Sequence, residues 1–273
     1  MDIYIKEFYQ QPSDDFPSGN FHQVIALNEA PDIPWDVISR QVPKLKKGWY
    51  ELAHLTAQDR IEFTRDFWLA TLPYYPHLQE FVVRFFNSLD DIGIYLTQKQ
   101  YDDEFEAQMV YSVANNGGFF RGFSPADETE MSEFQKSFPD HIFPPDYIAF
   151  MSIHNGFCKA TDSTGIFKVE HMLEQFRAFQ SMIENMGGTV TTERGIVVNP
   201  KTLIPFYESF GMPFFQCFWS DWYPQNVTGM GNVYFSVTSK TVSDPLNYED
   251  ASSLNMSFTT FAKWLMFYLE RIA

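Results

Sequence analysis

Residues 143–157 read Phe143-Pro144-Pro145-Asp146-Tyr147-Ile148-Ala149-Phe150-Met151-Ser152-Ile153-His154-Asn155-Gly156-Phe157 and predict a short helix with both ends specified. Pro145 suits the first helical position, which needs no N–H donor. Asp146 in the first turn places negative charge at the positive end of the helix dipole. Asn155-Gly156 favours the left-handed conformation that ends many helices. Most residues of this segment are apolar, so the helix is expected to be mostly buried. The apolar residues are Tyr147, Ile148, Phe150, Met151 and Phe157. The stretch therefore predicts an architectural element rather than a catalytic one.

The composition indicates a globular protein with a large core. The chain has 273 residues, of which 45% are hydrophobic and 18% are aromatic. This length allows one large domain or two small ones. Most of the aromatic rings are expected in the core, and a minority are available for a contact surface.

The charge is strongly negative, at −16, with a pI of about 4.6. Such a surface disfavours nucleic acid and anionic membranes and suits a basic protein partner, although a merely solvated acidic surface gives the same composition. The start of the chain lacks a basic region followed by an apolar run, and no stretch reaches the ~18 apolar residues of a membrane span. With only two cysteines, Cys158 and Cys217, we expect a cytoplasmic protein with reduced thiols.

Periodicity predicts helices and strands in irregular order. Helical spacing occurs over 57–72, 76–87, 125–138, 169–186 and 258–272, the last with Ser257 as N-cap, and a helical turn is expected near 201–209. Alternation predicts a hairpin of 92–97 and 105–113, a short strand at 165–168, a small hairpin over 189–198, and strands at 213–219 and 232–238. Without βαβ alternation, this order predicts an α+β fold with a mainly antiparallel sheet.

No motif for catalysis or cofactor binding stands out. The glycine pairs are not followed by Lys-Ser/Thr, and the six histidines and two cysteines lack the spacing of a zinc site, so we expect no cofactor and no metal. His154 and Cys158 are close in sequence, but Cys–His dyads are normally assembled from distant segments. A hydrolase that uses Cys158 or a loop carboxylate remains an alternative.

Three segments resemble the SUKH superfamily, which groups bacterial toxin-immunity proteins with regulators of yeast cell-wall assembly. They are the Pro-Asp-Tyr helix ending in Asn155-Gly156 after an acidic helix, Leu203-Ile204-Pro205-Phe206-Tyr207, and Ser257-Phe258-Thr259-Thr260-Phe261. The resemblance covers residues 85–273 and leaves residues 1–84 as an N-terminal extension, largely helical after residue 57. It implies an α+β domain with a bent, mainly antiparallel sheet, packed helices and a non-catalytic function.

Immunity proteins of this superfamily commonly block a nuclease toxin, and a nuclease needs a basic surface to hold its substrate. An acidic protein is able to compete for that surface. Acidic loop residues and neighbouring aromatics are therefore the expected partner contacts: Asp90, Asp91, Asp102, Asp103, Glu104, Glu106, Trp219, Asp221, Trp222, Tyr223, Asp244, Glu249 and Asp250. The sequence leaves open a regulatory or housekeeping interaction protein on the same scaffold.

Overall fold

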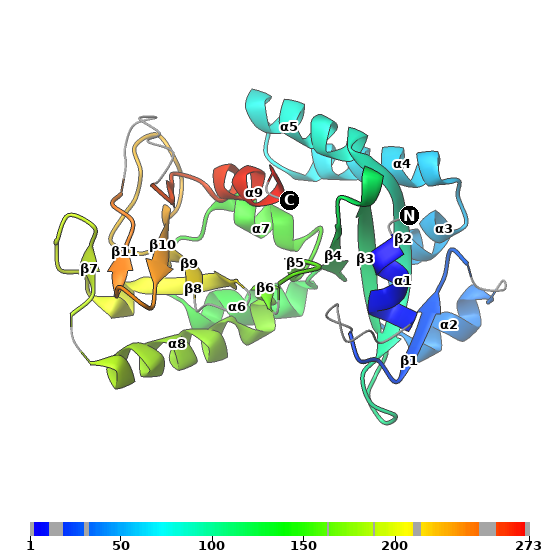
Figure 1. Ribbon diagram of the computed structural model, residues 1–273, viewed down its shortest axis with the longest axis horizontal. Helices are drawn as coiled ribbons and strands as arrows, with labels where there is room; N and C mark the ends of the chain where they lie inside the picture. Colours follow the sequence, from blue (N-terminus) through cyan, green and yellow to red (C-terminus); the bar gives the residue numbers. More distant parts are fainter. Residues whose placement is uncertain are drawn as a thin grey trace. The chain divides into compact units, whose positions relative to one another are not determined.

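The chain forms two compact units in a computed structural model that describes residues 3–10, 19–29, 33–162, 164–187, 189–209, 214–245 and 255–270 (Figure 1). Unit 1 comprises Met1–Pro125, Ile153–Thr161 and Leu269–Ala273. Unit 2 comprises Ala126–Ser152 and Asp162–Tyr268. The fold class is α+β with mainly antiparallel strands, as predicted. The predicted boundary after residue 84 falls within a helix of unit 1.

Unit 1 contains an antiparallel sheet in the order β1-β2-β3-β4-β5. The strands are β1 (Gln23–Ala26), β2 (Leu89–Gln98), β3 (Glu106–Val113), β4 (Phe119–Phe123) and β5 (Phe157–Lys159). The predicted hairpin is confirmed as β2–β3, in which Tyr95 pairs with Gln108. A 3₁₀ turn, η1 (Ala114–Asn116), follows β3.

In the described part of unit 1, the helices are α1 (Ile3–Gln10), α2 (Trp35–Gln41), α3 (Lys47–Ala53), α4 (Ala57–Thr71) and α5 (Pro76–Asn87). The predicted helices 57–72 and 76–87 are confirmed as α4 and α5. Thr56 caps α4 by accepting the Asp59 N–H, and Pro76 opens α5. The first three helices were not predicted, because each is short and offers few periodic positions.

Helices cover both faces of the unit 1 sheet. On one face, Trp68 of α4 packs edge-on against Tyr111 of β3, and Phe85 of α5 packs against Phe120 of β4. The opposite face carries Tyr95, which is 2% exposed. Residues Ile92 through Thr97 of β2 are all buried. Strand β2 is therefore covered on both faces and does not show the alternating burial expected for a half-buried strand.

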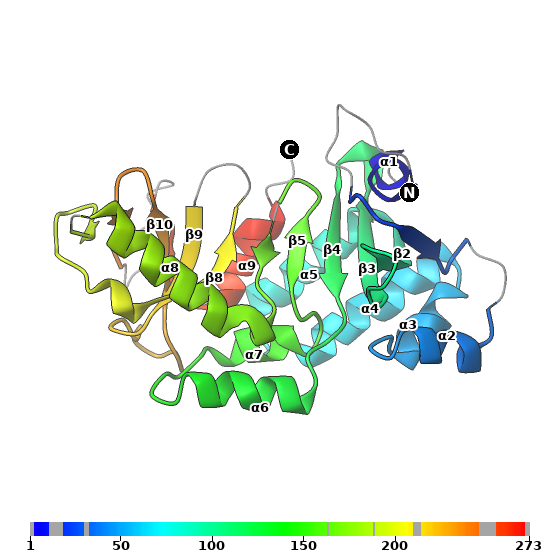
Figure 2. The ribbon, with the colours of Figure 1, turned by 90° about the horizontal axis from the view of Figure 1, so that it is seen from below.

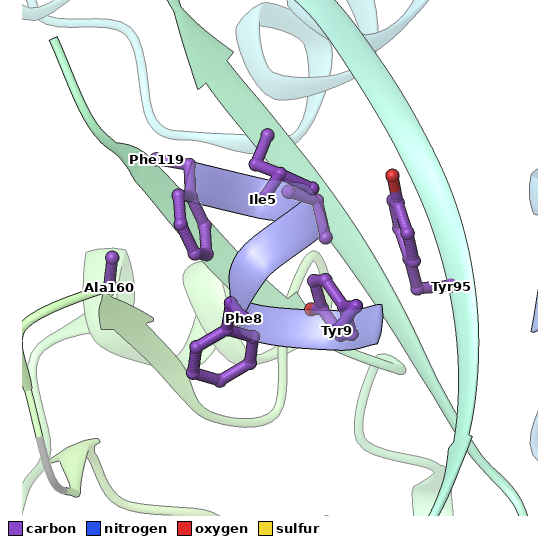
Figure 3. Close-up of a cluster of buried hydrophobic side chains, with 7 residues drawn as sticks. Ile5, Phe8, Tyr9, Tyr95, Phe119 and Ala160 are labelled. Atoms are coloured by element: carbon purple, nitrogen blue, oxygen red, sulfur yellow. The ribbon is translucent and has the colours of Figure 1, made fainter. Parts of the chain in front are cut away.

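Helix α1 covers this opposite face with an aromatic cluster (Figure 3). Tyr9 stacks on Tyr95 with ring centroids 4.3 Å apart, and Phe8 packs edge-on against Phe119. The Tyr9 hydroxyl donates to Gln108 Oε1 at 2.6 Å, so its polar end is hydrogen-bonded inside the cluster. The N-terminal residues thus supply layers on both faces of the unit 1 sheet.

A chain of hydrogen bonds crosses the α4 side of this core. Trp68 Nε1–H donates to the Tyr111 hydroxyl at 3.1 Å, and that hydroxyl donates to His154 Nε2 at 2.5 Å. His154 Nδ1–H then donates to the Phe123 carbonyl at 3.0 Å, which leaves Nε2 as the acceptor. The ring lies against Gly122, where a Cβ would come within 2.4 Å of Nδ1. Burial lowers the pKa of His154 to about 3, so the imidazole is neutral at ordinary pH.

Unit 2 contains a sheet in the order β6-β8-β9-β10-β11-β7, with β12 paired to β10. The strands are β6 (Gly165–Ile166), β7 (Thr191–Thr192), β8 (Leu203–Glu208), β9 (Phe214–Trp219), β10 (Asn232–Ser236), β11 (Thr241–Val242) and β12 (Ser257–Phe258). The α-helices are α6 (Glu128–Ser137), α7 (Pro145–Met151), α8 (Met172–Met186) and α9 (Phe261–Glu270), with 3₁₀ turns η2 (Val169–His171) and η3 (Pro200–Thr202). Helix α8, labelled in Figure 2, packs its Phe179 on Phe215 from one face of the sheet. Tyr147 of α7 packs on Phe218 from the other face.

Three predicted elements of unit 2 are corrected. The expected helical turn near 201–209 is instead strand β8, a continuous apolar run that is buried and tolerates Pro205 at a bulge. The terminal helix begins at Phe261 rather than 258, because Ser257 and Phe258 pair with β10. In the predicted hairpin over 189–198, Thr191 bridges Val197, but the strand β7 pairs in parallel with β11.

The opening stretch forms helix α7, which ends at Met151, before the predicted stop. Ser152 closes the helix with right-handed geometry, and Gly156 takes its positive φ of 96° at the approach to β5. Asn155 N–H donates to the Ser124 carbonyl, and Phe123 N–H donates to the Gly156 carbonyl. These sheet-like bonds compete with further helical turns and end the helix early.

Asp146 links the beginnings of two helices. Its Oδ1 accepts the Tyr147 N–H of α7 at 3.0 Å, and its Oδ2 accepts the Ala262 N–H of α9 at 2.7 Å. The side chain is buried, and desolvation raises the pKa of the carboxyl despite these two bonds. The carboxylate therefore binds the positive ends of two helix dipoles, although the sequence indicated only one.

We expect Asp146→Ala to lower the free energy of unfolding by about 2–4 kcal/mol, because two buried N–H groups lose their acceptor. Asp127→Ala provides a matched control. Asp127 makes a similar cap on α6, but it is solvent-exposed, and its loss should cost about 1 kcal/mol. Urea denaturation measures both, and equal losses would contradict the linking role of Asp146.

We expect His154 to make the protein less stable in acid. Its pKa in the folded state lies below the ordinary value of about 6.5, so below that pH the unfolded chain takes up a proton that the folded chain refuses. The loss should approach about 1.4 kcal/mol per pH unit until the pH nears about 3. The raised pKa of Asp146 acts in the opposite sense and offsets part of this loss.

To isolate the contribution of His154, the free energy of unfolding is measured at several pH values for the wild type and for His154→Gln. Between about pH 6.5 and pH 5, the free energy of unfolding of the variant should fall less steeply with decreasing pH than that of the wild type. The difference in slope should approach that of about one bound proton. NMR titration of the wild-type imidazole gives a second readout. Protonation of His154 in the folded protein near its ordinary pKa would refute the assignment.

Candidate functional site

The acidic residues expected to bind a partner in unit 1 lie at two ends of one hairpin. Asp90 and Asp91 are near the start of β2, whereas residues 102–104 occupy the turn between β2 and β3. Strand β2 continues for eight residues from Asp90 to Gln98, which corresponds to about 26 Å. The two acidic groups therefore do not form one patch.

Asp91 is engaged inside unit 1. Its Oδ1 accepts Arg60 Nη2–H at 2.6 Å and Nε–H at 3.0 Å, and the side chains are only 9% and 14% exposed for Arg60 and Asp91 respectively. The Arg60 Nη1–H donates to the Leu55 carbonyl at 2.6 Å. This pair fastens α4 to β2. Asp90, the next residue, is exposed.

The turn of the β2–β3 hairpin presents an aromatic ring among carboxylates. Tyr101 is 77% exposed, and Asp102, Asp103 and Glu104 follow it on the surface. Glu106, at the start of β3, is half-buried and pairs with Thr97 in the sheet. We call Tyr101 to Glu104 the acidic turn.

Hydrogen bonds hold the acidic turn in shape. Gln98 Nε2 donates to the carbonyls of Tyr101 at 2.9 Å and Asp103 at 2.7 Å, and Asp103 Oδ2 accepts the Gln100 N–H at 3.0 Å. The His22 ring lies edge-on to Tyr101 at 5.5 Å. Asp103 thus has a structural task in the turn, and the exposed carboxylates of Asp102 and Glu104 are available to a partner.

The expected aromatic anchors in unit 2 are mostly packing residues. Trp219 is 9% exposed and its indole N–H donates to Thr202 Oγ1 at 3.1 Å, and Trp222 is 6% exposed. Their neighbours Asp221 and Tyr223 are on the surface, with Tyr223 45% exposed. The indoles therefore offer little area to a partner.

The last acidic segment is described in part. Asp244 is 7% exposed, and its Oδ2 lies 3.7 Å from Arg194 Nε. This pair is long, and Arg194 is largely in solvent, so it contributes little. Glu249 and Asp250 lie outside the described residues.

His154 and the two cysteines are buried in the cores of the two units. Cys158 is 2% exposed, with its Sγ 3.8 Å from the Arg121 carbonyl, and His154 is committed to Tyr111 and Phe123. Cys217 is fully buried, which raises the pKa of its thiol. Over the described ranges, no three His, Cys, Asp or Glu side chains gather in a way that could hold a metal ion.

No family model matches the chain, and no curated protein is significantly similar to it. Within the part of the chain that the structure describes, no helix is long and apolar enough to cross a membrane.

Sequence reasoning missed the exposed aromatics beside the acids. Tyr101 lies between the predicted strands 92–97 and 105–113, and Phe67 lies within the predicted helix 57–72, and neither assignment indicates that these rings are 77% and 49% exposed. A helical projection of the sequence indicates the exposure of two of these rings. Phe63 and Phe67 are one turn apart and point away from the side of Ile61 and Trp68.

Adjacent residues allow a direct check on Asp91. We expect Asp91→Ala to destabilise unit 1 by about 3–5 kcal/mol, because it leaves the Arg60 guanidinium buried without its carboxylate. Asp90→Ala should cost at most about 1 kcal/mol, since that side chain is exposed. Chemical denaturation measures both, and a small loss for Asp91→Ala would return this residue to the candidate partner surface.

Proposed function

We propose that this chain is a non-catalytic protein-binding module of the SUKH type that works in the cytoplasm and neutralises a basic, nuclease-type toxin domain. The acidic turn is the observation that carries the proposal. It combines exposed carboxylates with an exposed tyrosine on a turn held by internal hydrogen bonds.

The chemistry of the acidic turn suits a basic partner. Asp102 and Glu104 can accept hydrogen bonds from arginine or lysine, and the Tyr101 ring can hold a guanidinium against its face. Because Gln98 and Asp103 already order the backbone, little conformational freedom is lost on binding.

The net charge of −16 supports the same partner class at longer range. A negative field accelerates encounter with a basic protein and weakens encounter with nucleic acid. An immunity protein benefits from rapid association because the toxin must be blocked before it reaches its substrate.

Two parts of the fold support membership of the superfamily. The Pro-Asp-Tyr segment begins a buried helix, α7, that follows the acidic helix α6. Leu203 to Tyr207 forms strand β8 next to the core strand β9, in the position that the resemblance implies for this apolar-proline element.

Charge reversal of the acidic turn tests the proposal. The variant Asp102→Lys/Glu104→Lys keeps the structural Asp103 and should slow association with a basic partner recovered by pull-down at least about tenfold at low salt. The difference should shrink as salt screens the charges. Stopped-flow or surface-based kinetics measure the on-rate.

Glu133→Lys/Glu184→Lys is the matched control, because it makes the same change in net charge at exposed helical positions of unit 2. It should slow association much less than the turn variant. Equal effects of the two variants would mean that the turn acts only through the overall charge of the protein. Recovery of a partner without a basic surface would contradict the toxin-neutralising proposal.

A further inference from the structure

Helix α4 carries aromatic side chains on its solvent side. Phe63 and Phe67 are 61% and 49% exposed and lie one helical turn apart. Tyr74, three residues after the end of α4, is 77% exposed. We call Phe63, Phe67 and Tyr74 the α4 aromatic face; α4 itself is visible in Figure 1.

The core does not require these rings. The buried residues of α4 are Arg60, Ile61, Thr64 and Trp68, and they fasten the helix to the rest of unit 1. Two phenylalanines in water at one-turn spacing expose apolar area that only another surface can cover. The aromatic pair is therefore better explained by a docked partner than by folding.

Carboxylates flank the α4 aromatic face. Glu62 and Asp66 are exposed, each directly before one of the two phenylalanines, and Asp59 lies one turn before Phe63. Asp66 is paired with Arg65 at 2.9 Å, so the helix surface has three carboxylates against one guanidinium. Gln58 Nε2 donates to Glu62 Oε1 at 2.6 Å, and Thr56 Oγ1 donates to Asp59 Oδ2 at 2.7 Å. Neither neutral donor cancels the negative charge.

We propose that the α4 aromatic face docks an amphipathic helix of a protein partner, with apolar residues along one stripe and arginine or lysine beside it. The apolar stripe covers Phe63 and Phe67 by packing between ridges spaced one turn apart. The basic residues meet Glu62 and Asp66, and an arginine is able to stack on a phenylalanine as well.

A second copy of this chain is the poorer occupant. Each copy carries a charge of −16, and two α4 helices packed together would bring Glu62 and Asp66 of both copies into one interface. Like charges at close range oppose such a dimer, whereas a basic helix removes the repulsion.

The α4 aromatic face shares no residue with the acidic turn. The acidic turn lies in the β2–β3 connection and offers one tyrosine with carboxylates, whereas the α4 aromatic face offers a helical apolar stripe. Variants of the two surfaces can therefore fail separately.

A designed helical peptide of about 18 residues, with a leucine stripe flanked by lysine and arginine, is the probe. Fluorescence anisotropy with the full chain should show binding that weakens at least about tenfold in Phe63→Gln/Phe67→Gln. Glutamine is a good helix former, so α4 should persist, and circular dichroism checks this. Val37→Gln removes an exposed side chain from α2 and should leave binding within about threefold.

Two further arms separate charge from apolar contact. Glu62→Gln should weaken binding of the basic peptide at low salt, and a peptide with the same leucine stripe but glutamate flanks should bind at least about tenfold more weakly to the wild type. The turn variant, Asp102→Lys/Glu104→Lys, should bind the basic peptide with an affinity within about threefold of the wild type.

Three results would overturn the inference. The first is binding of the peptide that is unchanged in Phe63→Gln/Phe67→Gln, or no binding at all. The second is equal affinity for the acidic peptide. The third is a wild-type dimer in sedimentation that disappears in the same variant, because it would assign the face to a second copy.

Discussion

Two buried polar side chains, His154 in unit 1 and Asp146 in unit 2, hold helices in place against the aromatic cores through their hydrogen bonds. In unit 1, the neutral His154 connects Tyr111 of the sheet, and through it Trp68 of α4, to the Phe123 carbonyl. In unit 2, Asp146 connects the starts of α7 and α9. Leaving either group without its hydrogen-bond partners would destabilise the fold by more than the bonds themselves stabilise it. The helices joined by these bonds therefore tolerate little displacement.

A second carboxylate in unit 2 follows the same rule. Asp162 is 9% exposed and accepts hydrogen bonds from the hydroxyls of Tyr207, at 3.1 Å, and Tyr268. The two tyrosines also pack against one another, with ring centroids 5.2 Å apart. Such polar ends allow tyrosine to replace phenylalanine in the core, and they account for part of the high aromatic content.

The same rule divides the acidic residues by function. Asp91 and Asp146 hold internal donors and fasten secondary structure, whereas Asp102, Glu104 and Glu62 project from the surface. Only the second kind is exposed to a partner. The strongest candidate surfaces join exposed carboxylates to exposed rings, because charge steers a partner and apolar area retains it.

Local pattern was sufficient where an element is long and its signals are local. Helices α4 and α5, the β2–β3 hairpin and the α+β class follow from periodicity, proline positions and alternation. The sequence by itself also determined the acidic character of the molecule. Tertiary structure decided the rest: β8 is a strand because Leu203 to Phe206 are buried between layers, and Asp91 became internal because Arg60 folds against it. Exposure of Phe63 and Phe67 depends on which side of α4 meets the sheet, and that choice belongs to packing between distant segments.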